Sequence, residues 1–335
     1  MKFGLALPHY DFSFPDKEPV SFARTAEGAQ TAERLGFDSV WISDHFFLSL
    51  ERYGGGKQLS GSLEPMTTLA ALAPLTERIR LGTMVLSAPF RHPANLAKMA
   101  TAVDLLSSGR MELGIGAGWY EAEFRAFGFE YARAAERFAH LDEVLEVLTL
   151  LLTEGPADFD GDRFHLRGAY NHPLPASKPR PPIWLGAKGG PRALRLAAKH
   201  ADGWNTVWRW SPESYGDRVA EARRACEAEG RDPNSLRLSV GLYTLVGEDE
   251  RDLVSRFRKL QRWTPGGALD GELLEDFARD ALVGTPEAII ETLARFAAFG
   301  VEEMIISPAS LPFAVFDPSM LELFAEAVIG PARNL

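Results

Sequence analysis

The chain has 335 residues, of which 46% are hydrophobic and 24% charged, a composition typical of a globular protein with a large core. Its formal net charge is −10 at pH 7, with acidic and basic residues interspersed, which argues against a nucleic-acid-binding surface and a polybasic membrane patch. A single cysteine, Cys226, excludes an internal disulfide and a cysteine metal cluster, and we expect a protein of the reducing cytoplasm.

Strand-like and helix-like segments alternate along the first half of the chain. Residues 2–8 (KFGLALP) predict a strand, residues 20–36 an amphipathic helix that ends at Gly36, and residues 37–43 a second, buried strand. The same alternation continues to Gly155, with strands predicted at 79–86 and 110–116 and helices at 65–79, 93–109 and 133–155.

Residues 156–182 interrupt this alternation. They contain a predicted hairpin around Asp160 and Gly161 and a proline-rich connection, PLPASKPRPP. After them the alternation resumes, with strands predicted at 182–187, 204–208, 236–246 and 302–307 and helices at 191–203, 212–230, 248–263, 285–300 and 318–330. We therefore interpret residues 156–182 as an insertion within a single domain that covers residues 1–335.

The alternation gives about eight buried strands and at least eight helices, a number that suits either a (β/α)8 TIM barrel or a doubly wound sheet. We favour the barrel, with inserted loops at its C-terminal rim. In such a barrel the active-site residues follow the strands, as His9 follows the first predicted strand. The loops at 46–64, 156–182, 205–211 and 263–276 are then the ones expected to set substrate specificity.

The segment SDHFF, residues 43–47, follows the second predicted strand. His45 could donate or accept a proton near physiological pH, and Asp44 could orient it. Alternatively, Asp44 caps a following turn and His45 is a hydrogen-bonded residue without a chemical role.

A glycine-rich turn at residues 186–190 leads into a helix that begins with Pro191. Free backbone N–H groups and the helix dipole would favour an anion there, and Lys188 and Arg192 would add positive charge. A Gly-Gly-Pro turn is equally an ordinary way to start a helix, and the GK[ST] ending of a P-loop is missing.

Residues 114–124, GIGAGWYEAEF, place three glycines before Trp119. The third glycine of the dinucleotide-binding fingerprint is missing, so a Rossmann interpretation is weak. The glycines could let a flat ring approach the strand end, or they could serve tight packing. Glu121 and Glu123 suit the first turn of a helix.

Several other kinds of site are not indicated. The seven histidines form no HExxH or HxH pair, so we predict no metal site. There is no GxSxG motif of a serine hydrolase. No apolar run approaches the roughly 18 residues of a membrane-spanning helix, and the sequence MKFGLALPHY does not look like a secretory signal.

The following stretches occur in one order along most of the chain: AERLGFDSVWISDHF, RLGTMVLSAPF, GIGAGWYEAEF, PPIWLGAKG with HADGWN, and VGTPEAIIETLARFAAFGVEEMIIS. Together they resemble the bacterial luciferase-like monooxygenase superfamily. Within it, SDHFF, RLGTMV and GIGAGWYEAEF are most similar to the coenzyme F420-dependent oxidoreductases.

The resemblance implies a barrel that holds a flavin or 5-deazaflavin at its C-terminal rim, with coenzyme F420 as the cofactor. It places Asp44 and His45 near the reactive ring, makes the Met84–Val85 peptide a non-proline cis bond against the ring, and puts the cofactor phosphate on Gly189 and Gly190. The cofactor-binding residues it implies are Thr83, Met84, Val85, Gly116, Trp119, Ala187, Lys188, Gly189 and Gly190.

The activity implied is hydride transfer between F420 and a small organic substrate, since the deazaflavin has a carbon where FMN has a nitrogen and reacts poorly with oxygen. His45 would supply or take the accompanying proton, with Asp44 tuning it. A homodimer is also implied. One alternative keeps the fold but uses reduced FMN and oxygen as a monooxygenase, together with a separate reductase. Another is a non-catalytic flavin-binding barrel.

The sequence departs from the family at two positions. Sugar-phosphate dehydrogenases of the superfamily carry a catalytic glutamate where this chain has Trp119, which argues against sugar-phosphate oxidation. The luciferase has an arginine on the FMN phosphate where this chain has Ala117, which disfavours FMN bound in that way.

Overall fold

The computed structural model describes residues 1–16, 18–153 and 155–335. Its fold is the predicted (β/α)8 barrel of the α/β class, and each barrel strand is followed by at least one helix. The eight parallel strands are β1 Lys2–Ala6, β2 Ser39–Ile42, β5 Arg80–Thr83, β7 Met111–Gly116, β10 Ile183–Gly186, β11 Gly203–Trp208, β12 Arg237–Val246 and β14 Val301–Ser307.

The chain divides into two compact units. The first unit consists of residues 1–63, 205–220 and 237–335, and the second unit of residues 64–204 and 221–236. Each unit contains several barrel strands and the helices that cover them, so each is described by itself.

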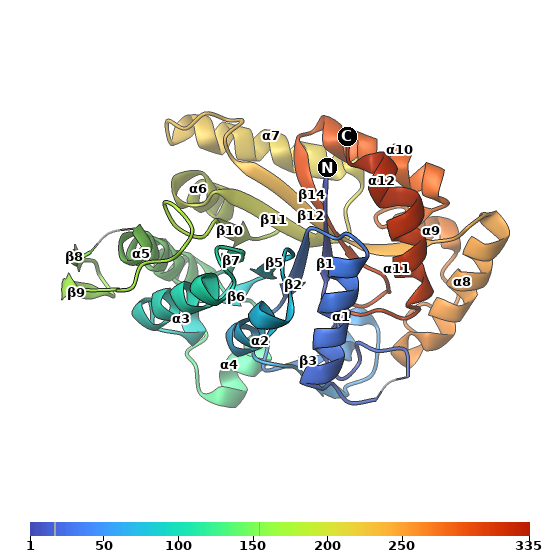
Figure 1. Cartoon of the computed structure of the whole chain (residues 1–335), viewed down its shortest axis with the longest axis horizontal. Helices are drawn as coiled ribbons and strands as arrows, with labels where there is room; N and C mark the ends of the chain where they lie inside the picture. Colours follow the sequence, from blue (N-terminus) through green and yellow to red (C-terminus); the bar gives the residue numbers. More distant parts are fainter. Residues whose placement is uncertain (17, 154) are drawn as a thin grey trace. The chain divides into compact units, whose positions relative to one another are not determined.

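In the first unit, β1 lies between β14 and β2 and pairs with both in parallel, and β14 also pairs with β12 (Figure 1). The strand faces are almost wholly buried, as expected for parallel strands covered by helices. The helices are α1 Phe22–Arg34, α8 Glu250–Trp263, α9 Leu274–Ala278, α10 Pro286–Ala298, α11 Ser319–Phe324 and α12 Gly330–Ala332. The long helix α7 Pro212–Ala228 belongs partly to each unit.

The helix boundaries in this unit follow local sequence signals. The Ser21 side chain accepts a hydrogen bond from the Arg24 N–H at the start of α1, and Gly36, just after its end, has a φ of +85°. Thr285 caps α10 by accepting from the Ala288 N–H, and Pro286 is its first residue. Helix α1 therefore lies within the predicted range 20–36 but ends at Arg34 and not at Gly36, and α10 lies within the predicted range 285–300.

In the second unit, β7 pairs in parallel with both β5 and β10. The helices are α2 Pro65–Leu72, α3 Pro93–Leu106, α4 Glu121–Phe127, α5 Ala134–Thr153 and α6 Pro191–His200. The predicted hairpin is present as β8 Ala157–Asp160 and β9 His165–Ala169, antiparallel, with Asp160 opposite His165. It projects beyond α5 in Figure 1, as an insertion would.

Several short elements were not predicted. The segment 46–64, expected to be a loop, contains the antiparallel strands β3 Phe47–Ser49 and β4 Leu59–Gly61. A short strand, β13 Leu282–Gly284, pairs with β12. These strands have only three residues each, which is too short for a recognisable alternation pattern. Among the described helices, none has both the length and the apolar character needed to cross a bilayer.

Glycines in β7 and β10 make room for the chain that follows β5. A Cβ added to Gly114 would lie 1.9 Å from the Thr83 carbonyl oxygen, and one added to Gly186 would lie 2.4 Å from a methyl group of Val85. A Cβ on Gly116 would meet both Val85 and the Gly186 carbonyl oxygen at 3.0 Å. The three glycines thus form a slot that the Val85 side chain fills.

We predict that Gly186→Ala lowers the free energy of unfolding by about 1–3 kcal/mol, because the added methyl group would overlap the Val85 side chain that fills the slot. Gly330→Ala is the control, since no heavy atom lies within 4 Å of the added Cβ and the backbone there is helical. That change should leave stability unchanged or slightly higher. Urea unfolding of both variants measures the difference, and equal stabilities would contradict the slot.

Candidate active site

The candidate residues fall into two groups, one in each unit. Asp44 and His45 belong to the first unit. The second unit contains Thr83, Met84, Val85, Gly116, Trp119, Ala187, Lys188, Gly189 and Gly190. In both units the candidates lie at or just after the carboxyl ends of barrel strands, as the sequence predicts.

In the first unit, a buried histidine joins the ends of β1 and β2. His9 is fully buried, and its Nδ1 lies 2.7 Å from the Leu7 carbonyl oxygen, to which it donates. Its Nε2 accepts from the Ser43 N–H at 3.2 Å and lies 3.0 Å from the Ser43 hydroxyl. Both nitrogens are satisfied when the proton is on Nδ1. Burial lowers the pKa of His9 from 6.5 to about 3, so this side chain is neutral at pH 7.

The same hydrogen-bond network extends to a loop after β14. The Tyr10 hydroxyl lies 2.5 Å from the Ser43 hydroxyl, and the Tyr10 N–H donates to Ser13 at 3.0 Å. The Ser13 hydroxyl in turn donates to the Phe313 carbonyl oxygen at 2.6 Å. The ends of β1 and β2 and the loop after β14 are therefore held together directly beside Asp44.

Asp44 and His45 follow Ser43 at the end of β2. Asp44 is 7% exposed and His45 is half-buried. The Ser62 hydroxyl donates to the His45 carbonyl oxygen, which fixes the backbone of this turn. The imidazole is thus carried on a segment whose backbone is held from both sides, a suitable support for a proton-transferring group.

Aromatic side chains pack beside this network. The ring of Trp208 stacks on Tyr243, with centroids 5.6 Å apart and an interplanar angle of 11°, and meets Phe313 edge-on at 5.2 Å. Phe313 also lies 4.9 Å from the ring of His9. The peptide between Val207 and Trp208 is cis, which the sequence gave no reason to expect.

In the second unit, the predicted cis peptide between Met84 and Val85 is present. It directly follows Thr83, whose hydroxyl donates to the Gly114 carbonyl oxygen at 2.8 Å and accepts from the Gly114 N–H at 2.9 Å. Thr83 therefore ties β5 to β7. Together with the Val85 slot, this tie gives the glycines of GIGAG a packing role.

The turn after β7 is held by side chains from the segment that follows. The Arg137 guanidinium donates to the Gly118 carbonyl oxygen at 3.2 Å, and the Tyr131 hydroxyl donates to the Trp119 carbonyl oxygen at 3.0 Å. The Trp119 side chain is 40% exposed. Its backbone is thus fixed while much of its ring remains accessible to a ligand.

The segment after β10 leads into the N-terminus of α6. Gly189 has a φ of +81°, and Gly190 is the N-cap, with no side chain to bond the first N–H groups. The first turn of α6 contains no acidic residue, and Lys188 and Arg192 are exposed. The Trp204 indole N–H donates to the Ala187 carbonyl oxygen at 3.0 Å and fixes the turn. This is the arrangement that binds phosphate groups at helix N-termini.

One group of side chains in the second unit has the composition of a metal site. Within the described parts of the chain, ligand atoms of Asp142, Glu146 and His200 lie close enough to share an ion. However, the Lys199 ammonium lies 2.9 Å from Asp142 and 3.3 Å from Glu146, and His200 bonds Asp142 at 2.6 Å. The acids are thus already paired with a cation, and nothing else there points to a metal.

Comparison with known proteins gives matches over most of the chain. The model of the luciferase-like monooxygenase family matches residues 1–303. The chain is 34% identical over 241 residues to an F420-dependent glucose-6-phosphate dehydrogenase of Amycolatopsis mediterranei, covering 71% of this chain and 69% of that protein. It is 25% identical over 301 residues to an FMNH2-dependent dimethylsulfone monooxygenase of Pseudomonas putida, covering 82% and 79%.

A solved structure is similar in fold. It is an F420-dependent secondary alcohol dehydrogenase in complex with an F420-acetone adduct, with a TM-score of 0.77 and 20% identity over 99% of this chain and 98% of that one. At this identity the likeness supports the barrel fold alone.

The neutral state of His9 predicts a pH dependence of stability. Its folded-state pKa lies below the unfolded value, so the unfolded state binds the extra proton and stability falls as the pH drops from about 6.5 toward 3. The contribution is up to about 1.4 kcal/mol per pH unit.

We predict that His9→Gln, which cannot titrate, reduces the loss of unfolding free energy between pH 7 and about pH 4.5. Urea unfolding at several pH values measures this slope. His165→Gln is the control, because that side chain is 60% exposed on the inserted hairpin. Equal slopes for wild type and His9→Gln would show that His9 is not the buried neutral group described above.

Proposed function

The chain belongs to the luciferase-like monooxygenase family, and we propose on this basis that it is an F420-dependent oxidoreductase. The proposed reaction is hydride transfer between coenzyme F420 and a small organic substrate. Support comes from the F420-dependent glucose-6-phosphate dehydrogenase that is 34% identical. The structural observation that supports it most is the α6 N-terminus with its two exposed cationic side chains.

The residues of the second unit fit the phosphate of such a cofactor. A Cβ at Gly190 would meet no heavy atom within 4 Å, so the backbone there is open to a ligand. The N–H groups of the first turn and the positive end of the helix dipole would bind the phosphate. Lys188 and Arg192 would add charge. When bound, F420 supplies a carbon centre that accepts or donates hydride.

The ring-binding role of the strand ends is also part of the proposal. Met84 and Val85 would support one face of the ring, with Gly116 and Ala187 as its backbone neighbours. The slot that holds Val85 keeps this backbone in place. Trp119, with its partly exposed ring, would limit the space for the substrate.

In the first unit, His45 would hold the proton that accompanies hydride transfer, and Asp44 would set its orientation and charge. His9 follows β1 and bonds to Ser43 at the end of β2, so it would position the His45 backbone. Because burial keeps the pKa of His9 near 3, His9 does not compete for that proton near pH 7.

Sugar-phosphate oxidation is not part of the proposal, although a relative has that activity in its name. The sugar-phosphate dehydrogenases of the family that this chain resembles have a catalytic glutamate at the position where this chain has Trp119. A tryptophan cannot take up a proton from a hydroxyl group. We further propose that the protein is a cytoplasmic homodimer, in line with the resemblance.

The first test is equilibrium binding of the purified protein to F420 and, in parallel, to FMN. The proposal expects micromolar or tighter binding of F420, with FMN at least tenfold weaker, a difference of about 1.4 kcal/mol. The reverse preference would contradict it and favour the FMN-dependent monooxygenase reaction, with a separate reductase as partner. The relative from Pseudomonas putida makes this the alternative to test.

The phosphate site predicts the effect of a charge reversal. Arg192→Glu should weaken F420 binding at least tenfold, or about 1.4 kcal/mol, because it places a negative charge beside the phosphate. The same change does not weaken α6, since acidic residues are favourable in a first turn. Arg224→Glu, on the exposed face of α7, should leave affinity unchanged. Equal effects of the two variants would exclude phosphate binding at α6.

The proton-transfer role of His45 predicts a split between binding and turnover. His45→Ala should leave the Kd for F420 within about twofold but reduce the rate of reduced F420 oxidation by a panel of ketones by about 10²-fold or more. Stopped-flow absorbance of the deazaflavin measures this rate. His165→Ala on the exposed hairpin is the control. Unchanged turnover would remove His45 from the mechanism.

A further inference from the structure

Helix α8 in the first unit has two contrasting faces. The inner face packs Leu253, Phe257, Leu260 and Trp263 into the core. It also carries Arg256, which is 8% exposed and donates to Asp252 at 2.5 Å and to Asp317 at 3.3 Å. The charge of this inner arginine is therefore balanced by two carboxylates.

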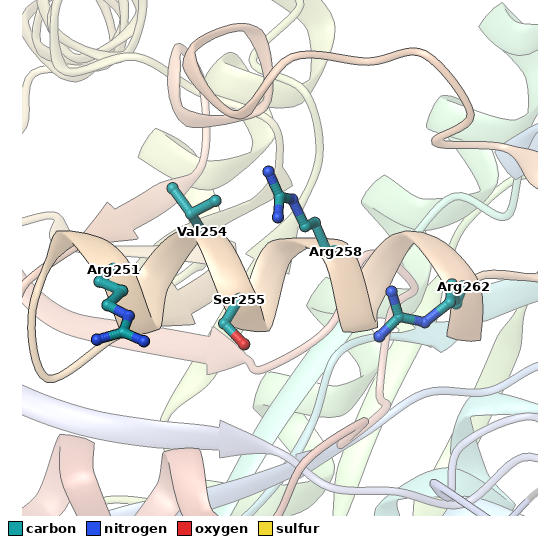
Figure 2. Close-up of a pocket in the computed structure, with 5 residues that line it drawn as sticks. All are labelled: Arg251, Val254, Ser255, Arg258 and Arg262. Atoms are coloured by element: carbon teal, nitrogen blue, oxygen red, sulfur yellow. The ribbon is translucent and has the colours of Figure 1, made fainter.

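The outer face carries three more arginines. Arg251, Val254, Ser255, Arg258 and Arg262 line an open surface depression of about 450 Å³ on this one helix, called the α8 groove below. Figure 2 shows all five side chains projecting from α8. In this view Arg251, Ser255 and Arg262 lie toward the lower edge of the ribbon, and Val254 and Arg258 lie toward its upper edge. Their spacing of three or four residues places them on one exposed face of the helix.

The three outer arginines differ from Arg256 in their surroundings. Among the residues that the structure describes, no carboxylate lies within ion-pair distance of Arg251, Arg258 or Arg262. Surface arginines elsewhere are commonly paired, as Arg195 is with Glu229 and Arg237 with Glu302. On a chain with a net charge of −10, the outer face of α8 is a local positive surface.

We infer that this groove binds an acidic helical segment of a partner protein. The three arginines span twelve residues of α8, and the eleven steps of 1.5 Å between Arg251 and Arg262 give about 16 Å. A partner helix with glutamates at the same spacing would present a carboxylate to each guanidinium, a geometry that favours charge-assisted hydrogen bonds. Val254, which is 37% exposed and lies between Arg251 and Arg258 along α8, would contact an aliphatic side chain between two of those acids.

The overall negative charge of the protein favours a short acidic segment over a larger polyanion as the partner of this groove. A nucleic acid or an anionic membrane meets the repulsion of the whole acidic protein. A short segment in the groove is affected mainly by nearby charges, because the Debye length is only about 8 Å at physiological ionic strength. None of the groove residues belongs to the proposed cofactor-binding or proton-transfer groups, so this inference does not depend on the F420 chemistry.

The test uses the full chain and a fluorescein-labelled synthetic helix with glutamates at matching positions and leucine between them. Fluorescence anisotropy should give saturable binding at about 50 mM salt that weakens at about 200 mM. Replacing Arg251, Arg258 and Arg262 by alanine should weaken binding at least tenfold. Alanine has the highest helix propensity, so α8 should remain folded, and unchanged F420 affinity and unfolding midpoint would verify this.

The matched control removes three charges elsewhere. Lys2, Arg34 and Arg224 are exposed on other elements, and their replacement by alanine should leave peptide affinity within about twofold. A second peptide of the same composition, with its glutamates distributed around the helix, should bind at least tenfold more weakly.

Four results would overturn the inference. They are no saturable binding at low salt, an equal loss in the control variant, equal affinity for the redistributed peptide, and tighter, groove-dependent binding of a single-stranded oligonucleotide. Sedimentation of the chain alone tests a further occupant: self-association that disappears in the α8 variant would assign the groove to a second copy of the chain.

Discussion

Each buried polar side chain at the carboxyl end of a strand must find its hydrogen-bond partner inside the protein, because water does not reach it. In the first unit, this requirement joins His9 to Leu7 and Ser43, and Ser43 to Tyr10. In the second, it joins the Thr83 hydroxyl to the Gly114 backbone. In each unit the strand ends that carry the candidate residues are fixed by these bonds, so each group of candidates is positioned by the protein's own contacts.

Close packing adds a second restraint in the second unit. The slot between Gly114, Gly116 and Gly186 is filled by Val85. The absence of side chains at these three positions therefore makes room for a side chain of the protein itself. A flat ring at this position would meet a surface already set by that packing. The two interpretations of GIGAG are therefore connected, because tight packing of Val85 holds the backbone that the proposed ring would contact.

Charge acts locally in this protein, despite the net value of −10. The N-terminus of α6 combines free N–H groups with exposed Lys188 and Arg192, which suits a phosphate. The outer face of α8 presents a positive groove to other proteins. Both regions lie on an acidic chain, where surface repulsion discourages large polyanions while nearby cations still attract small or narrow anionic groups.

The sequence by itself determined the features that depend on local periodicity and capping. These are the alternation of strands and helices, the hairpin at Asp160 and Gly161, the start of α10 at Thr285 and Pro286, and the positions of the candidate residues at the ends of β2, β5, β7 and β10. Only the tertiary structure decided which distant groups meet, because contacts between residues far apart in sequence leave no periodic signal. Thus only the folded chain shows that β3 pairs with β4, that burial keeps His9 neutral, and that the glycines of GIGAG make room for Val85.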